Sequence, residues 1–372
     1  MFCVFWERIG AKGGDWMKYF SCTTKIVTGM PAQNVLKKLD FDKIFIVSDP
    51  FFAKNGVAQG LGQQARAYEI FDNVTPDPTV LLVAEGTARL QKFSPDALVV
   101  LGGGSAIDCA KAMGYFSGRE IPLIVIPTTS GSGSEVTDFS ILTHDGVKHP
   151  LVDGALRPTM AILDEAFVSS LPPALIADGG FDVLAHALEA WVAKNADGFS
   201  DMLALQAFQT VYWNLSDSFA GDLTARKKIH TASTMAGLAF THAGLGVCHA
   251  LSHALGGAFH LPHGRLNAIL LPAVIGNNVS SARYAALSRA AGIGGSSDAM
   301  ASRNLKNGLI RLRTQLKLPA TLAAAGVDPT VLRQKQDGLI TAALADPCCE
   351  TNPTPVTREL LAQILKEASG IG

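Results

Sequence analysis

The distribution of strand-like and helix-like segments along the chain constrains its fold more than any other sequence feature. In the first half, short runs rich in β-branched and apolar residues alternate with segments of helical spacing. Such alternation predicts a parallel sheet that helices cover on both faces. The expected strands are Lys43–Ser48, Ala67–Phe71, Ala97–Leu101 and Leu123–Ile126, and the expected helices between them are Thr79–Phe93 and Ser105–Tyr115.

The second half of the chain has a different pattern of residues, which begins near Pro172 and Pro173. Strand-like runs disappear, and Ala/Leu-rich segments with helical spacing follow one another. These segments predict an all-helical domain. The expected helices are Gly180–Lys194, Ser200–Trp213, Leu223–Ala239, Gly246–Leu255, Leu266–Asn277, Ala282–Ala291 and Ala301–Leu316. We therefore divide the chain into an α/β domain at residues 17–178 and a helical domain at residues 179–372.

Residues 1–16 fit neither domain. They show no helical or strand periodicity, and they lack the apolar core and cleavage site of a signal peptide. Two interpretations stay open. The segment is either a short targeting tail or an extension upstream of a native start at Met17, because Lys12–Asp15 can be encoded by a purine-rich sequence like a bacterial ribosome-binding site.

Composition and charge exclude several classes of protein. Apolar residues make up 48% of the 372 residues and charged residues only 17%, which excludes a disordered chain. The net charge of −1 and the absence of a long Lys/Arg run argue against binding to nucleic acid or to an anionic membrane. No apolar run approaches the roughly 20 residues of a membrane span. The six scattered cysteines indicate reduced thiols, so we expect a cytoplasmic protein.

A glycine-rich turn, Gly102–Gly104, lies between an expected strand and an expected helix. Glycines let a ligand approach the backbone closely, and the free amides of a helix N-terminus suit a pyrophosphate. Ser105 can cap this helix. Because the turn departs from the standard GxGxxG pattern, a purely structural tight turn stays open as an alternative.

A second polar loop, Thr128–Thr137, follows the strand Leu123–Ile126 in the same way. Two such loops at the carboxyl ends of neighbouring strands form the crevice in which open α/β sheets bind nucleotides. Asp49 ends another strand, and its carboxylate would favour NAD over NADP by accepting a hydrogen bond from a ribose hydroxyl. A solvated turn aspartate is the alternative interpretation of Asp49.

Four of the nine histidines lie within residues 249–263. His249 and His253 are four residues apart in one expected helix, and Asp182 and His186 repeat this spacing in another. Residues at this spacing share a helix face and can bind one ion. One carboxylate with several imidazoles suits Fe²⁺ or Zn²⁺ and suits Mg²⁺ or Ca²⁺ poorly.

Several details of this cluster stay open. Gly256 and Gly257 are expected to end their helix, so that His263 falls in the following turn. Asp182 has a second interpretation as a helix cap. His260 is explained equally well as a packing residue, as part of a substrate wall or as a ligand.

Together these motifs resemble the iron-containing (group III) alcohol dehydrogenases, within the wider group of dehydroquinate synthase-like folds. The resemblance implies a Rossmann-like α/β domain followed by an all-α domain, and it runs across nearly the whole chain from about Lys18. The matching segments are Thr75–Thr79, Gly102–Asp108, Ile126–Thr137, Phe181–Glu189, Gly244–Gly246 with His249 and His253, Pro262–Gly264 with Asn267 and Ala268, and Thr351–Pro353.

The resemblance implies a role for each candidate site residue. The metal ligands would be Asp182, His186, His249 and His263, with His253 as the catalytic proton relay. The cofactor-binding residues would be Gly102, Gly103, Gly104, Ser105, Asp108, Thr128, Thr129 and Thr137, together with Asp49 and with Lys148, which would reach the cofactor ribose. The chain departs from the family pattern at Asp77, where Asn is frequent, and at Ser132 and Ser134.

The implied reaction is reversible oxidation of a small primary alcohol, such as propanol, ethanol or a short diol, to its aldehyde with NAD⁺. A divalent metal, Fe²⁺ before Zn²⁺, would lower the pKa of the alcohol as a Lewis acid, and hydride would pass to the nicotinamide. The finer likeness is to bacterial enzymes of diol and ethanolamine breakdown. It implies a homodimer and an association with a bacterial microcompartment.

Two other enzyme classes stay open. A zinc polyol dehydrogenase of the glycerol type would use a three-ligand Asp/His/His site, whereas this chain also supplies His186. A dehydroquinate synthase-like lyase would need a basic pocket for a phosphorylated, carboxylated substrate, and few Lys/Arg residues lie near the metal motifs.

Overall fold

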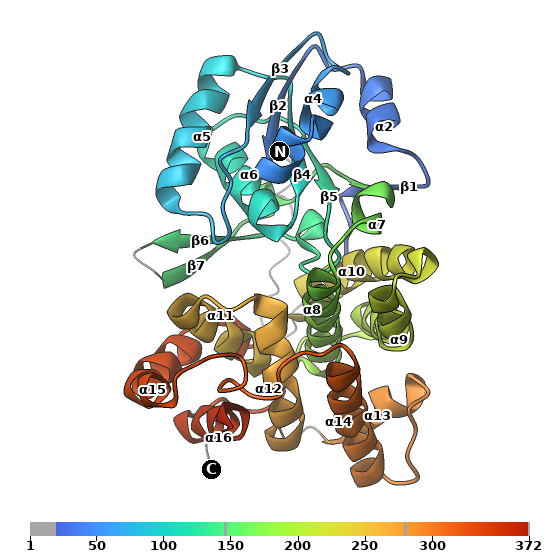
Figure 1. Cartoon of the computed structure of the whole chain (residues 1–372), viewed down its shortest axis with the longest axis vertical. Coiled ribbons are helices and arrows are strands. Elements are labelled where there is room, and N and C mark those ends of the chain that lie inside the picture. Colours follow the sequence, from blue (N-terminus) through green and yellow to red (C-terminus); the bar gives the residue numbers. More distant parts are fainter. Residues whose placement is uncertain (1–19, 145–146, 279–280, 371–372) are drawn as a thin grey trace, which may run out of the picture.

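The computed structural model describes residues 20–144, 147–278 and 281–370. The first half of the chain forms a sheet with flanking helices, and the second half gathers into a block of helices beneath it (Figure 1). Residues 1–16 and Met17, with the two interpretations of that segment, lie outside the described residues.

Six strands form one parallel sheet in the order β1-β8-β5-β4-β2-β3. The two central strands β4 and β5 are buried along their whole length, as expected for a parallel sheet with both faces covered. The four strands expected from the sequence are confirmed, and β1 and β8 are additional. The strands are β1 (Lys25–Thr28), β2 (Lys43–Ser48), β3 (Ala67–Phe71), β4 (Ala97–Gly102), β5 (Leu123–Pro127) and β8 (Met160–Leu163).

Alternate residues of each strand enter two separate cores, because successive side chains point to opposite faces. In β2, Phe45 and Val47 pack with α5 and α6, whereas Ile44 and Ile46 pack with α2, α3 and α4. Both expected helices of this half are confirmed as α5 and α6. The helices are α2 (Ala32–Leu39), α3 (Pro50–Lys54), α4 (Val57–Gly62), α5 (Val80–Phe93) and α6 (Gly104–Phe116).

An antiparallel hairpin lies between the sheet and the helical block (Figure 1). Its strands are β6 (Phe139–His144) and β7 (Val147–Val152), and β7 contacts α11 of the helical block. The turns η2 (Ser134–Val136) and η3 (Gly154–Leu156) flank the hairpin, and the short helix α7 (Ala166–Ser169) leads out of the sheet.

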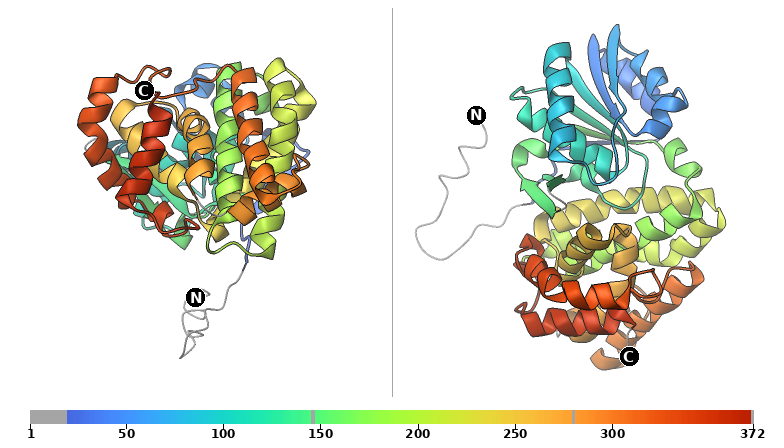
Figure 2. Two further views of the ribbon diagram at one scale, coloured as in Figure 1. Left: turned by 90° about the horizontal axis from the view of Figure 1, so that it is seen from below. Right: turned by 60° about the vertical axis from the view of Figure 1, so that its left-hand side comes forward.

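The prediction of an all-helical second half is confirmed (Figure 2). The expected boundary between residues 178 and 179 lies inside α8, and α15 and α16 are helices beyond the expected ones. None of the helices in the described ranges is long and apolar enough to cross a membrane. The helices are α8 (Pro173–Val192), α9 (Gly198–Ala220), α10 (Leu223–Ala243), α11 (Val247–Phe259), α12 (His263–Asn277), α13 (Ser281–Ala290), α14 (Asp298–Gln315), α15 (Pro329–Leu344) and α16 (Arg358–Ser369), with the turn η4 (Pro347–Cys349).

Two expectations about the histidine cluster are wrong. Helix α11 continues through Gly256 and Gly257 and ends at His260, whose φ of 54° is left-handed. His263 is the first residue of α12 and does not lie in a turn. A Cβ on Gly256 would lie 3.7 Å from Nζ of Lys148, which is an ordinary van der Waals contact, so packing does not require a glycine here.

The loop between β5 and β6 packs closely against helices of the second half. A Cβ on Gly133 would lie 2.7 Å from the Cα of Gly237 in α10, and a Cβ on Gly179 in α8 would lie 2.5 Å from the carbonyl oxygen of Ser130. Real side chains do not approach so closely, so glycine is required at these contacts. The loop therefore forms the seam between the sheet and the helices α8 and α10.

Candidate functional site

Two glycine-containing loops face each other at the carboxyl ends of β4 and β5. A Cβ on Gly103 would lie 3.1 Å from Oγ1 of Thr129, and a Cβ on Gly104 would lie 3.1 Å from Oγ of Ser132. Because β4 and β5 are neighbouring parallel strands, this is the edge at which α/β sheets bind nucleotides. The structure thus brings the two predicted loops side by side at this edge of the sheet.

The helix that leaves the first loop, α6, has no side-chain cap. Its N-cap residue is Gly103, and Ser105 lies in the first turn, so the expectation that Ser105 caps the helix is wrong. A side-chain hydroxyl caps a helix from the N-cap position, and Ser105 lies inside the helix, past that position. The first N–H groups of the helix therefore have no side-chain acceptor, which suits the binding of a pyrophosphate.

Asp108 and Thr137 belong to a buried network beneath the loops. Nζ of Lys111 donates to Oγ1 of Thr137 at 2.9 Å and to Oγ of Ser134 at 3.2 Å, and Ser134 Oγ donates to Oδ1 of Asp108 at 2.7 Å. Burial lowers the pKa of Lys111 to about 8 and raises that of Asp108. Because their side chains bind within the protein, Asp108 and Thr137 support the two loops from below. Their contact with the cofactor stays a prediction.

Asp49 lies at the end of β2 beside the glycine turn. Its Oδ1 accepts hydrogen bonds from the backbone N–H of Phe51 and of Phe52 at 3.0 and 3.3 Å, so it caps α3. Its Oδ2 lies 3.6 Å from the position that a Cβ on Gly102 would take. Oδ1 thus caps the helix, and Oδ2 lies beside the glycine turn. The geometry leaves Oδ2 available for the predicted hydrogen bond with the ribose.

The four predicted metal ligands converge from three helices. The Nε2 atoms of His186, His249 and His263 lie 4.0, 3.9 and 3.5 Å from Oδ1 of Asp182. In a tetrahedral site with bonds of 2.0–2.2 Å, the ligand atoms lie about 3.4 Å apart. Ligand atoms of Asp182, His249 and His263 all lie within 4.8 Å of one another and could hold one first-row cation. His186 lies outside this group, although its Nε2 is 4.0 Å from Oδ1 of Asp182. The N/O donor set suits Fe²⁺ or Zn²⁺.

The first turn of α12 brings His263 to this site by contact with α8. A Cβ on Gly264 would lie 1.8 Å from the carbonyl oxygen of Asp178, so only glycine lets the two helices meet here. Arg265 then pairs with Asp178 through Nε at 3.2 Å and NH2 at 2.9 Å. These two contacts fix the start of α12 against the helix that carries Asp182.

The electrostatics of the four side chains favour a bound cation. Burial raises the pKa of Asp182 to about 7 and lowers that of His186 to about 3, and it lowers the pKa values of His249 and His263 as well. A buried carboxylate among neutral imidazoles is costly unless a positive charge compensates it. The donor set therefore supplies a site for a cation rather than an ordinary ion pair.

Two site residues were missed by sequence reasoning. Glu189, which is buried, accepts hydrogen bonds from Nδ1 of His249 at 2.7 Å and from the backbone N–H of Cys248 at 2.7 Å. The first contact leaves Nε2 of His249 free to face Asp182. Asn267 donates from Nδ2 to Oδ1 of Asp182 at 2.8 Å. A signal for Glu189 existed, because it lies two helical turns after Asp182 on the same face of α8.

A cavity of about 610 Å³ lies between β7, α11 and α15, and its lining does not include the four predicted metal ligands. His253 and Lys148 line it. The ring of His253 stacks on that of His263, with centroids 5.1 Å apart and planes at 15°. Nζ of Lys148 forms an ion pair of 2.6 Å with Asp77, the residue at which the chain departs from the family pattern. The exposed His260 ends α11.

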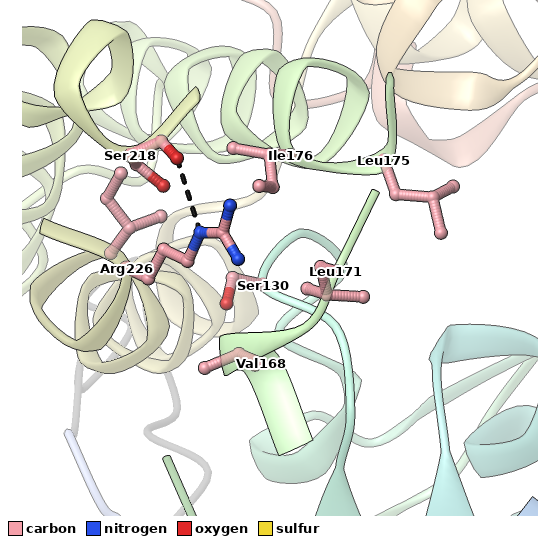
Figure 3. A pocket seen from close by; sticks show the side chains of 8 residues that line it. Ser130, Val168, Leu171, Leu175, Ile176, Ser218 and Arg226 are labelled. Carbon is pink, nitrogen blue, oxygen red and sulfur yellow. Dashed lines mark hydrogen bonds between the residues drawn. The ribbon is translucent and has the colours of Figure 1, made fainter. Parts of the chain in front are cut away.

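A second, much smaller cavity lies at the seam near Ser130 (Figure 3). Its volume of about 10 Å³ is room for about one water molecule. Nε of Arg226 donates to the carbonyl oxygen of Ser218 at 3.2 Å across it, and NH1 of Arg226 donates to the carbonyl oxygen of Ser169. This cavity is a packing feature between α7, α8, α9 and α10, and it is too small for a substrate.

Comparisons with known proteins identify the family of the chain. Residues 26–165 match the model of the family "iron-containing alcohol dehydrogenase", and residues 176–369 match the model of the C-terminal part of the Fe-containing alcohol dehydrogenase family. A 1-propanol dehydrogenase PduQ of Citrobacter freundii is 41% identical to this chain, over 94% of this chain and all of that protein. An NADPH-dependent butanol dehydrogenase of Clostridium saccharobutylicum is 34% identical, over 80% of this chain and 83% of that protein.

Solved structures are similar across nearly the whole chain. A 1,3-propanediol oxidoreductase superimposes with a TM-score of 0.88 at 30% identity, and it matches 95% of this chain and all of its own. An iron-containing alcohol dehydrogenase from Thermococcus thioreducens gives a TM-score of 0.86 at 31% identity, with the same coverage.

Proposed function

Because the chain belongs to the iron-containing alcohol dehydrogenase family, we propose that it interconverts a short primary alcohol such as propanol, ethanol or a short diol with its aldehyde. Family membership makes the chain an NAD-dependent oxidoreductase of the iron type, and it does not support the zinc polyol dehydrogenase. The choice of propanol as first substrate is supported by the 41% identity to a 1-propanol dehydrogenase over that protein's full length.

One observation carries the proposal: the second nucleotide loop touches the metal site. A Cβ on Gly131 of that loop would lie 3.5 Å from Oδ2 of Asp182. The loop proposed to bind the cofactor therefore packs against the helix that carries Asp182 and His186. A single small substrate can be in contact with both, which hydride transfer requires.

In the proposed mechanism, Asp182, His186, His249 and His263 hold the metal. When bound, it acts as a Lewis acid that lowers the pKa of the alcohol. The two glycine loops hold the pyrophosphate and thereby aim the nicotinamide at the cleft. His253, stacked on His263 at the cavity wall, carries the proton between the alcohol and the solvent.

The test is an assay of anaerobically purified protein whose metal content has been measured. We expect iron at about one ion per chain and NADH oxidation with propanal, acetaldehyde and butanal, with the highest kcat/KM among these for propanal. NAD-dependent oxidation of glycerol that needs zinc and exceeds these activities would contradict the proposal in favour of a polyol dehydrogenase.

We further propose a cytoplasmic homodimer that works in diol or ethanolamine breakdown in association with a bacterial microcompartment. The identity to a 1-propanol dehydrogenase supports this placement. Fractionation of diol-grown cells tests it, because the protein should sediment with the microcompartment fraction. Light scattering of the purified protein tests the dimer, and a monomeric mass would contradict it.

A further inference from the structure

Asp346 accepts two hydrogen bonds of different kinds at the edge of the large cavity. Its Oδ1 accepts from the backbone N–H of Cys348 at 2.9 Å, so that it caps the turn η4. Its Oδ2 lies 2.7 Å from Nδ1 of His253 in α11. The two residues are 93 positions apart in the chain, so the fold brings this pair together.

Capping explains only the first of these contacts. The sequence Asp-Pro occurs at two other N-caps, Asp49 before α3 and Asp328 before α15, and there one carboxylate oxygen accepts from two backbone N–H groups. A cap needs a single oxygen, and Asn serves as well as Asp. The second oxygen of Asp346 has a different task, because it binds an imidazole.

The contact determines which nitrogen of His253 carries the proton. A carboxylate accepts only, so Nδ1 of His253 is the donor and Nε2 is left without a proton. Although burial raises it, hydrogen bonds from His253 and Cys348 hold the pKa of Asp346 at about 2, so the acceptor is ionised at neutral pH. Stacking on His263 fixes the plane of the same ring.

We propose that Asp346 is a positioning residue for proton transfer, which holds His253 in the tautomer and orientation whose Nε2 accepts the proton of the alcohol. The proposal rests on the alcohol dehydrogenase function above. In the transfer, the alcohol O–H bond breaks, the Nε2–H bond forms, and the proton then leaves Nε2 for water in the cavity. The hydride step is unchanged.

The principal variant is Asp346→Asn, which keeps the size of the side chain and can keep the cap. Its amide cannot serve both contacts as an acceptor, so we expect kcat to fall by about 10- to 100-fold. The KM for propanal, the Kd for NADH and the iron content should stay within about two-fold. Asp328→Asn is the matched control, because it alters the same kind of Asp-Pro cap at an exposed position before α15, and it should keep full activity.

A double-mutant cycle separates positioning from a structural role. In a His253→Ala background, adding Asp346→Asn should lower kcat by less than a further two-fold. Added imidazole should restore activity equally to the single variant His253→Ala and to the double variant. An equal loss in both backgrounds, full activity of Asp346→Asn, or full activity of His253→Ala would each overturn the proposal. Inactivity of the wild-type enzyme toward all short aldehydes would instead overturn the proposed function itself.

Discussion

The side chain of His263 is 27% exposed, whereas that of His249 is 1% exposed. Both belong to one set of metal ligands, but they are held in different ways. His249 is fixed by the buried Glu189, and His263 by the backbone contact of its own helix with α8. Removing His263 therefore removes a ligand while it disturbs little of the core.

We expect His263→Ala to lose bound iron and to lower kcat by more than about 100-fold, because the cation loses one imidazole of three. Elemental analysis and the NADH assay measure the two effects, and circular dichroism should show an unchanged fold. His260→Ala is the control, because His260 lies in the same cluster and is exposed. A His263→Ala enzyme that works fully without metal would show that the site is wrongly assigned.

Asp49→Gly should reduce the preference for NADH over NADPH by about 10- to 100-fold, because the 2′-phosphate of NADPH would no longer meet a carboxylate. Glycine is a tolerated N-cap, so the loss of stability should be only a few tenths of a kcal/mol. The ratio of kcat/KM values for the two cofactors is the measurement. The capping function alone would leave this ratio unchanged, as Asp328→Gly should.

Sequence reasoning found the ligands but not the residues that orient them. Asp182 and His186 are recognisable because four residues separate them on one helix face. Glu189 and Asp346 act on histidines that are 60 and 93 positions away in the chain. The pairing of such distant residues depends on how helices pack. For Glu189 the sequence holds only its position two turns after Asp182 on one face of α8, and for Asp346 it holds no comparable local pattern.

The first turn of α12 shows how one element is placed by another. A Cβ at Gly264 would overlap the backbone of α8, so Gly264→Ala should move the start of α12 and carry His263 away from Asp182. We expect a loss of iron affinity and activity of at least about 10-fold and a loss of about 1–3 kcal/mol in the free energy of unfolding. Metal titration and urea unfolding measure these changes.

The control for this variant is Gly60→Ala in α4, where a Cβ would meet nothing within 4 Å. Because alanine favours a helix more than glycine does, Gly60→Ala should leave activity unchanged and stabilise the protein by up to about 1 kcal/mol. Equal behaviour of the two variants would mean that α12 adapts without moving His263.

Element ends were the least predictable part of the fold. Gly256 and Gly257 look like a helix stop, but α11 passes through both and ends at Phe259. The strand β1 was not recognised because it has four residues and lies at the edge of the sheet. Local propensity was overruled at both places by tertiary packing.

For the whole molecule, acid sensitivity follows in part from His230, which is buried in α10 with Nδ1 3.0 Å from Oγ of Ser130. Burial lowers its pKa to about 4. Below pH 6.5 the unfolded chain binds a proton that the folded protein refuses, so stability falls as the pH falls toward 4. Between pH 7 and pH 5 this residue should cost about 2 kcal/mol.

His230→Gln should remove that part of the pH dependence. The measurement is the free energy of unfolding in urea at pH 7 and pH 5, for the wild type, for His230→Gln and for the exposed control His260→Gln. The control should lose as much stability as the wild type does. If His230→Gln also loses the same amount, the acid sensitivity arises from other groups.

The division into an α/β and a helical half could be predicted from the alternation of segments, because burial on both faces of a sheet leaves a clear pattern. The seam between the halves could not. Its contacts join glycines such as Gly133 and Gly237. Because glycine has no side chain, its residue type gives no indication of which segment it contacts.

That seam limits how the enzyme can be re-engineered by recombination. The loop carrying Gly133 is fitted to α10 at Gly237, and the neighbouring Ser130 is fitted to Gly179 of α8. A chimera that takes its cofactor half from one relative and its metal half from another must therefore inherit both sides of each contact from the same parent. A crossover placed after α8 and α10 preserves these pairs, whereas one at the apparent border between the halves separates them.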